Sequence, residues 1–237
     1  MSDNAPRTVT REQWLTERHA LLKKEKALTR MRDLVSAERR RLPRVRVETD
    51  YIFDTPSGKQ RLADLFGEYS QLIVHHLMFD PDWDEACVGC TFQADHIEGP
   101  RPHLAHQDTR IVAVSRAPLT KLQAYRERLG WQFEWVSSYN SDFNYDFGVS
   151  FTPEQIASGE IDYNFGTITT DPRYLQTREL PGVSVFSRDE AGQIYHTYST
   201  YARGLDELIG MHHYQDLTSK GRSGASGPGP LRRRDEY

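Results

Sequence analysis

The stretch QLIVHHLMFDPDWDEACVGCTFQADHIEGP, residues 71–100, decides the fold that we predict. Its first nine residues, 71–79, are a mainly apolar run, as expected for a strand buried on both faces of a sheet. The chain's two cysteines, Cys87 and Cys90, follow three positions apart, and Gly99-Pro100 closes the stretch. We therefore expect a buried strand and then a helix over 87–98 that begins at the cysteines.

The segments that follow continue this alternation of strands and helices. We expect a second buried strand over 109–117 and a helix over 118–130 with Pro at its start and Gly at its end. A hairpin over 183–200 and a last helix over 204–210 are expected to follow. A strand, a helix and a second strand imply parallel pairing with a right-handed crossover. From residue 71 the order is β-α-β-α, an insertion, then β-β-α. The prediction is an α/β protein with a thioredoxin-like fold.

The chain of 237 residues is expected to have three parts. Residues 1–43 form an N-terminal helical extension, ended by Pro43, and its apolar residues recur every seven positions at Trp14, Leu21, Leu28, Val35 and Leu42. Residues 44–218 form the thioredoxin-like domain, with an aromatic-rich insertion at about 131–180 before the C-terminal hairpin. Residues 219–237 are rich in Gly, Ser and Pro, and we expect a disordered tail.

Composition favours a cytoplasmic protein. We find no apolar stretch of membrane-spanning length, and the first residues lack the apolar core of a secretory signal. Two cysteines in a chain of this size do not make a disulfide scaffold. In a reducing compartment, a Cys-x-x-Cys next to a βαβ pattern indicates redox or metal chemistry.

Charge is unevenly distributed along the chain. Residues 11–46 carry twelve Lys or Arg against five Asp or Glu, a net charge of +7, whereas the remaining residues carry −11. Such a basic segment could be a nucleic-acid-binding arm, but it lacks an accompanying pattern of aromatic residues. We favour a helix that lies on the acidic body or on a sister subunit, which would give a homodimer, and we predict neither nucleic acid nor membrane as a partner.

The position of the cysteines suggests how they would react. A thiolate is the reactive form of cysteine, and the unpaired N–H groups at a helix N-terminus stabilise it. We therefore predict Cys87 as the nucleophile and Cys90, one turn along the same face, as the resolving thiol. Asp84 and Glu85 lie just before Cys87 and would oppose its ionisation.

Three further residues are expected to bind substrate. Gly89 would let the backbone of a partner approach closely, and Trp83 lies just before the cysteine pair. Pro181, directly before the hairpin, is expected to be a cis-proline packed against the cysteines. The alternative at Pro181 is a trans-proline that starts a strand.

Longer motifs resemble a known family. Over roughly residues 14–217, the chain resembles the bacterial family called domain of unknown function 899. The stretches that carry the resemblance include LLKKEKALTRMRD, LADLFGEYSQLIVHHLMF, CVGCTFQADHIEG and WVSSYNSDFNYDFGVSFT. The resemblance implies a thioredoxin-like fold and a predicted dithiol–disulfide oxidoreductase activity, with Cys87 and Cys90 matching the family's cysteine pair. Family members often have Cys-Pro-Gly-Cys, whereas this chain has Val88 in place of the proline.

Three alternatives stay open at this point. Cys87, Cys90, His96 and either His103 or His106 could bind zinc. A peroxiredoxin-like peroxidase would use the same fold, although Thr91 follows Cys87 rather than preceding it. A non-catalytic interaction module would leave the cysteines inert.

Disulfide exchange is our prediction. It would require no bound cofactor, a disulfide-containing protein or a small-molecule thiol as partner, and an external thiol reductant.

Overall fold

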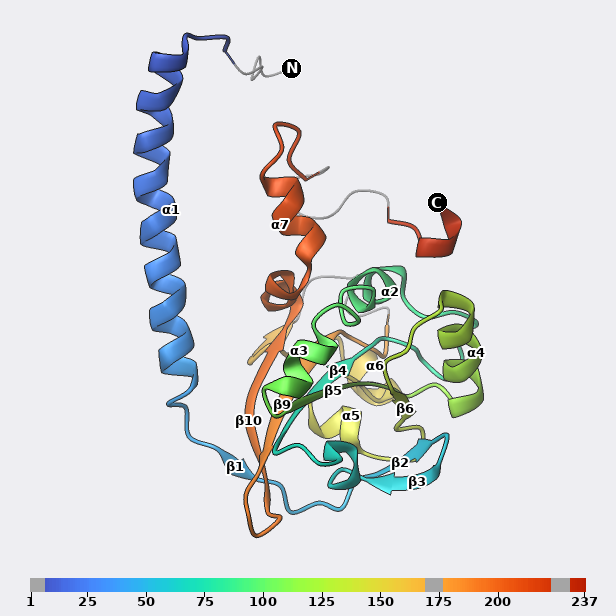
Figure 1. Cartoon of the computed structure of the whole chain (residues 1–237). Helices are drawn as coiled ribbons and strands as arrows, with labels where there is room; N and C mark the ends of the chain where they lie inside the picture. The colour runs from blue at the N-terminus through green and yellow to red at the C-terminus, as the bar shows by residue number, and fades with distance from the viewer. Residues whose placement is uncertain (1–6, 169–176, 223–230) are drawn as a thin grey trace. The chain divides into compact units, whose positions relative to one another are not determined.

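The computed structural model describes residues 7–168, 177–222 and 231–237. In these ranges eight strands form one mixed sheet in the order β1-β10-β9-β4-β5-β6-β2-β3 (Figure 1). Their bounds are β1 Val45–Arg46, β2 Ile52–Thr55, β3 Gly58–Arg61, β4 Gln71–His76, β5 Thr109–Ser115, β6 Trp135–Ser137, β9 Gly182–Arg188 and β10 Ile194–Tyr201.

The four strands β10-β9-β4-β5 give the sheet its thioredoxin-like topology. β4 and β5 pair in parallel, whereas β9 pairs antiparallel with both β4 and β10. The parallel pair requires a crossover, which α2 (Val88–Ala94) and α3 (Arg101–His106) supply. The fold is therefore the α/β, thioredoxin-like fold that the sequence predicted, although the expected helix over 87–98 ends early, at Ala94.

Alternation along β4 and β5 divides the core between the two faces of the sheet. Leu72 and Val74 of β4 belong to the apolar cluster that contains Phe143, together with Val112 and Val114 of β5. Side chains of opposite parity face the second cluster, which includes Phe79, Cys90, Leu122 and Trp135. The second cluster packs beneath α2 and α4 (Leu119–Leu129), so the helix that carries the cysteines is held by the core.

The insertion contributes to the sheet as well as covering it. β6 pairs in parallel with β5, and the next elements are α5 (Phe143–Asp146), α6 (Pro153–Ser158) and a two-stranded sheet of β7 (Ile161–Tyr163) and β8 (Gly166–Ile168). After β10 the chain forms a 3-10 helix, Ala202–Leu208, and then α7, Gly210–Asp216. Another 3-10 helix, η1 (Asp64–Phe66), precedes β4.

Part of the expected tail is ordered. Residues 223–230 lie outside the described residues, but the 3-10 helix η3 (Arg234–Glu236) follows them, and its neighbour Arg233 contacts α4. The prediction of disorder is therefore wrong for residues 231–237, because arginine and carboxylate side chains there find partners that composition does not reveal.

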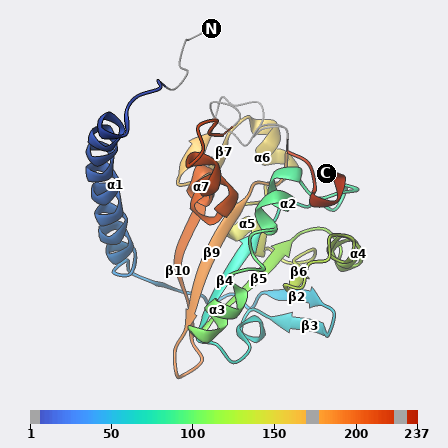
Figure 2. The same cartoon turned by 45° about the horizontal axis from the view of Figure 1, so that its top comes forward.

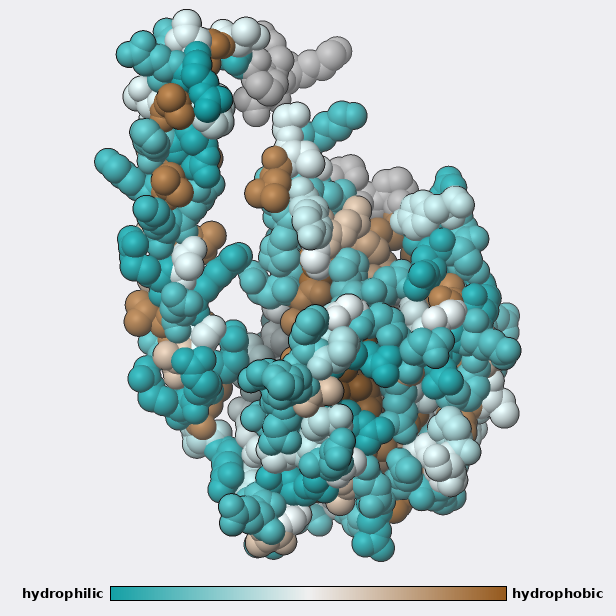
Figure 3. All heavy atoms as spheres, viewed as in Figure 1, coloured by the Kyte–Doolittle hydropathy of each residue, from teal (hydrophilic) through white to brown (hydrophobic). Residues whose placement is uncertain are grey.

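The N-terminal helix belongs to a unit of its own. The chain divides into two compact units, Met1–Pro43 and Arg44–Tyr237. α1 (Arg11–Arg39) begins with a capping box between Thr10 and Gln13, and none of its residues is buried. Figure 3 shows apolar side chains spaced along this helix. Among the described helices, none combines the length and the apolar character needed to cross a membrane.

Candidate functional site: a cysteine pair at the start of α2

The two cysteines lie where the chain passes from the C-terminal end of β4, a central strand, into α2. Cys87 is the N-cap residue of α2 and is half-buried, and its backbone N–H donates to the Met78 carbonyl at 3.0 Å. Cys90 lies one turn further along and is buried, with only 3% of its surface exposed. Both thiols are free. A partner molecule can therefore reach Cys87 far more readily than Cys90.

The surroundings favour a thiolate at Cys87 and a thiol at Cys90. The hydrogen bond from the Cys90 thiol, the N–H groups of Cys90 and Gly89 and the charge of Arg233 together lower the pKa of Cys87 to about 6, against the opposing effect of burial. The same hydrogen bond, burial and the negative charge of Cys87 raise the pKa of Cys90. The two cysteines therefore divide the roles of nucleophile and protonated neighbour.

A chain of hydrogen bonds connects this turn to the C-terminal segment. The Thr91 hydroxyl donates to the Cys87 carbonyl at 3.0 Å and lies 2.9 Å from the Tyr125 hydroxyl. The Arg233 guanidinium donates to Tyr125 at 2.8 Å and to the Ala86 carbonyl at 3.3 Å. Elements from three distant parts of the sequence thus hold the backbone around Cys87.

Glu179 forms a buried ionic group close to the pair. Its carboxylate, 1% exposed, pairs with Arg116 at 2.9 Å and accepts from the Ser150 hydroxyl at 2.7 Å. Burial raises the pKa of Glu179 to about 7, although Ser150 and Arg116 oppose the rise. The charge of Glu179 also helps to raise the pKa of Cys90, so Glu179 lies within electrostatic reach of the site.

Trp83 and Gly89 lie near Cys87, as sequence led us to expect. Trp83 packs against the same apolar cluster as Cys87, and its carbonyl accepts from the Lys121 ammonium at 2.7 Å. Gly89 is exposed, and a Cβ on it would lie 3.8 Å from the Cys87 sulfur. A methyl group there would cause no clash in the protein but would stand beside the sulfur. A substrate-binding role for either residue stays a prediction.

Pro181 differs from expectation. The described residues contain no cis peptide bond, so the prediction of a cis-proline is wrong and the Leu180–Pro181 bond is trans. The trans isomer is the intrinsically favoured form of an X–Pro bond, and β9 begins at the next residue, Gly182. The Pro181 carbonyl accepts from the Tyr163 hydroxyl at 2.7 Å. A substrate contact at Pro181 stays a prediction.

The arrangement of the histidines disfavours the zinc hypothesis. Both ring nitrogens of His96 are engaged, one 3.0 Å from the Phe92 carbonyl and the other accepting from the Met211 N–H. Within the described ranges, no three His, Cys, Asp or Glu side chains converge as metal ligands would. His75 and His76 are buried in β4, and burial lowers their pKa values to about 4 and about 3. These two histidines are neutral core residues that face opposite sides of the sheet.

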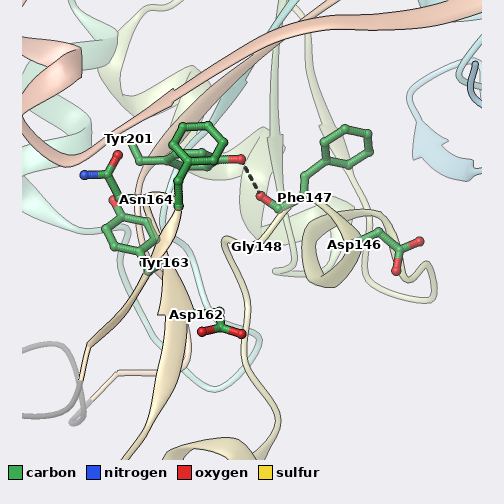
Figure 4. A pocket seen from close by; sticks show the side chains of 9 residues that line it. Asp146, Phe147, Gly148, Asp162, Tyr163, Asn164 and Tyr201 are labelled. Carbon is green, nitrogen blue, oxygen red and sulfur yellow. Dashed lines mark hydrogen bonds between the residues drawn. The ribbon is translucent and has the colours of Figure 1, made fainter. Parts of the chain in front are cut away.

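A separate hollow of about 490 Å³ lies over the insertion. Figure 4 shows the rings of Tyr163 and Tyr201 on one side of it and the Asp146 carboxylate on the other, with the Tyr201 hydroxyl donating to the Phe147 carbonyl at 3.0 Å. Neither cysteine lines this hollow. Tyr163, which lines the hollow, donates from its hydroxyl to the Pro181 carbonyl, so the wall of the hollow contacts the backbone directly before β9.

Sequence reasoning missed Arg233 and Glu179, whose charges act on the pair, and two further arginines, Arg116, which pairs with Glu179, and Arg178. Arg178 and Glu179 stand just before Pro181, in RELPG, and that placement was the available signal. Arg178 pairs with the buried Asp80 at 2.7 Å. Arg116 and Arg233 carry no local signal, because Arg116 follows a strand and Arg233 lies in a tail of low complexity.

The strand order and the cysteine pair at α2 define a thioredoxin-like protein. The chain belongs to the family described as bacterial protein of unknown function (DUF899), whose model matches residues 3–237. The resemblance seen in the sequence motifs is thereby confirmed. None of the curated proteins matches the chain.

Several solved structures are similar to this chain at a low level. A cysteine mutant of peroxiredoxin Q from Xanthomonas campestris is 13% identical, with a TM-score of 0.46 over 73% of this chain and 98% of its own. Peroxidoxin BcpB from Mycobacterium tuberculosis is 14% identical, with a TM-score of 0.45 over 75% of this chain and 97% of its own.

Proposed function

We propose that this protein is a thiol–disulfide oxidoreductase that exchanges its Cys87/Cys90 dithiol with the disulfide of a partner. One observation carries the proposal: a half-buried Cys87, with its pKa lowered to about 6, at the N-terminus of α2 and hydrogen-bonded to a buried Cys90. Near neutral pH such a cysteine is mostly thiolate, which is the nucleophilic form.

The first step is attack by the Cys87 thiolate on one sulfur of the partner's disulfide. A bond forms between Cys87 and that sulfur while the partner's S–S bond breaks, and the other sulfur leaves as a thiolate that takes a proton from water. Half-burial of Cys87 leaves one side open for this approach. The product is a mixed disulfide between Cys87 and the partner.

The second step follows from how the two thiols influence each other. The largest causes that raise the pKa of Cys90 are its hydrogen bond to Cys87, burial and the negative charge of Cys87. Once Cys87 is part of a mixed disulfide, its negative charge is gone, so Cys90 ionises more easily. The Cys90 thiolate then attacks the Cys87 sulfur, which forms the Cys87–Cys90 disulfide and releases the partner's second thiolate. Two electrons have passed to the partner.

A return to the dithiol requires an external reductant. A low-molecular-weight thiol or a protein dithiol, both available in a reducing cytoplasm, would supply two electrons and two protons. Candidate partners are therefore disulfide-containing proteins or small molecules. The expected contacts of Trp83, Gly89 and Pro181 with a partner belong to this proposal.

Trapping tests the proposal. The Cys90→Ser protein is expected to accumulate a mixed disulfide on Cys87 with a model disulfide, identified by mass spectrometry, whereas the Cys87→Ser protein is expected to form none. The rate of the first step should rise with pH around 6, because the thiolate fraction rises there. Absence of any mixed disulfide would refute the proposal.

The Cys90→Ser protein also distinguishes disulfide exchange from peroxidase activity. If hydrogen peroxide converts Cys87 to a sulfenic acid much faster than disulfides react with it, a peroxide rather than a disulfide is the substrate. The Thr91 hydroxyl favours disulfide exchange over this alternative, because it donates to the Cys87 carbonyl and lies against Tyr125 rather than being free to bind a peroxide.

A further inference from the structure

Glu85 stands two residues before the proposed nucleophile, and its charge needs a counterpart. A carboxylate close to a thiol disfavours the thiolate. In the structure Glu85 pairs with two arginines that are distant in sequence, Arg128 of α4 and Arg233 of the C-terminal segment. The Arg233 contact measures 2.7 Å.

The segment 231–237 is anchored beside the cysteines at several points. Arg128 pairs with Asp235 at 2.6 Å, and Arg234 lies 3.5 Å from Asp95, the C-cap of α2. The Arg233 side chain is only 13% exposed, although it belongs to the end of the chain. Figures 1 and 2 both show this segment beside α2 and α4.

The hydrogen bonds from Arg233 run in a consistent direction toward Cys87. Arg233 can only donate, so Tyr125 accepts from it. Thr91 uses its own proton on the Cys87 carbonyl, so Tyr125 donates to Thr91. A second branch runs from Arg233 directly to the Ala86 carbonyl at 3.3 Å. Both branches end on the peptide groups that flank the start of α2.

We infer that the C-terminal segment 231–237 is a working part of the dithiol site, in which Arg233 is a positioning residue that neutralises Glu85 and holds the backbone of Ala86 and Cys87. The inference rests on the proposed function for its role in exchange, but its contacts stand without it. Arg233 is also among the groups that lower the pKa of Cys87. Among the described residues, the other titratable or charged groups near Cys87 include Asp84, Glu85, Cys90, Tyr125, Arg128 and Glu179.

The test measures ionisation of Cys87 without any disulfide substrate. The full-length protein is alkylated with iodoacetamide over a range of pH, and mass spectrometry follows the modification of Cys87. Arg233→Gln should raise the pKa of Cys87, and a rise of about one unit would slow alkylation at pH 6.5 about threefold. Arg232→Gln is the matched control, because Arg232 is an exposed arginine of the same segment, and it should leave the rate unchanged.

Substitution of Glu85 tests whether Arg233 acts through the negative charge of this residue. If Arg233 acts by neutralising Glu85, the double variant Glu85→Gln/Arg233→Gln should recover most of the original rate. Glu85→Gln alone, which keeps Arg233, should react at least as fast as the unmodified protein, and this variant remains informative if Arg233→Gln fails to fold.

The inference is overturned by an unchanged rate in Arg233→Gln or by slower alkylation in Glu85→Gln. A double variant that stays slow would overturn the neutralisation of Glu85. Failure of the proposed function would look different, because a protein that exchanges no disulfide could still show every one of these changes in alkylation.

Discussion

α1 and α2 are helices of opposite kinds. α1 has 29 residues, begins with a capping box and has no buried residue, and its unit is separate from the body. α2 has seven residues, lacks a side-chain hydrogen bond at its N-cap, and buries five of them. Short helices are unstable alone and depend on tertiary packing. Local sequence therefore suffices to explain α1, whereas the core of the body holds α2 and places Cys87.

The strongest test of this contrast removes the packing under α2. Phe79 is 1% exposed and packs against Tyr125 and Trp135 in the cluster that contains Cys90. Phe79→Ala should lower the free energy of unfolding by about 3–5 kcal/mol, since it leaves a cavity. Urea denaturation measures the loss, and hydrogen exchange should accelerate in α2 but not in α1.

Phe165→Ala is the matched control for this prediction, because Phe165 is 83% exposed. It should change stability by about 0.5 kcal/mol or less. Equal losses in the two variants would mean that α2 does not depend on this core.

The next effect concerns pH. His75 is buried, and desolvation lowers its pKa from 6.5 to about 4. Between pH 6.5 and pH 4, His75 is therefore protonated in the unfolded chain but neutral in the folded protein. Stability that is present above pH 6.5 is therefore lost as the pH falls toward 4, by about 3 kcal/mol in total from this group.

His75→Gln should flatten that acid limb in denaturation curves measured between pH 7 and pH 4. His19→Gln, which changes an exposed histidine of α1, serves as the control and should leave the limb as it is. An unaltered slope in His75→Gln would show that other groups govern acid unfolding.

The smallest expected effect concerns the exposed face of α1. Apolar side chains recur there every seven residues, and Leu21 and Leu28 are about half exposed in the single chain. We propose that a second copy of the helix covers this face, because burying a leucine contributes about 1.5–3 kcal/mol. Leu28→Lys should weaken self-association at least about tenfold in sedimentation velocity.

Lys23→Gln changes the opposite side of α1 and should have no effect on association. A protein that is monomeric at all concentrations would refute the proposal.

Particular residues mark the limit of what could be predicted. The apolar run before the cysteines and the alternation of strands and helices were enough for the thioredoxin-like topology, since burial on both faces of a parallel sheet leaves a plain pattern. The Pro181 peptide bond was predicted as cis and is trans, and the order of residues 231–237 was not expected. The order of residues 231–237 depends on contacts with residues far away in the chain, such as Tyr125, whereas trans is the intrinsically favoured isomer of an X–Pro bond.

Taken by itself, the sequence determined the periodicity of α1, the order of elements from β4 onward and the three-residue spacing of Cys87 and Cys90, because these follow from local pattern. Only the tertiary structure decided that Glu85 pairs with Arg128 and Arg233, that Glu179 is buried close to Cys90 and that the end of the chain returns to the start of α2. The physical reason is that the effect of a charged group on the pKa of its neighbours depends on burial and on partners that are distant in sequence, and only folding supplies both.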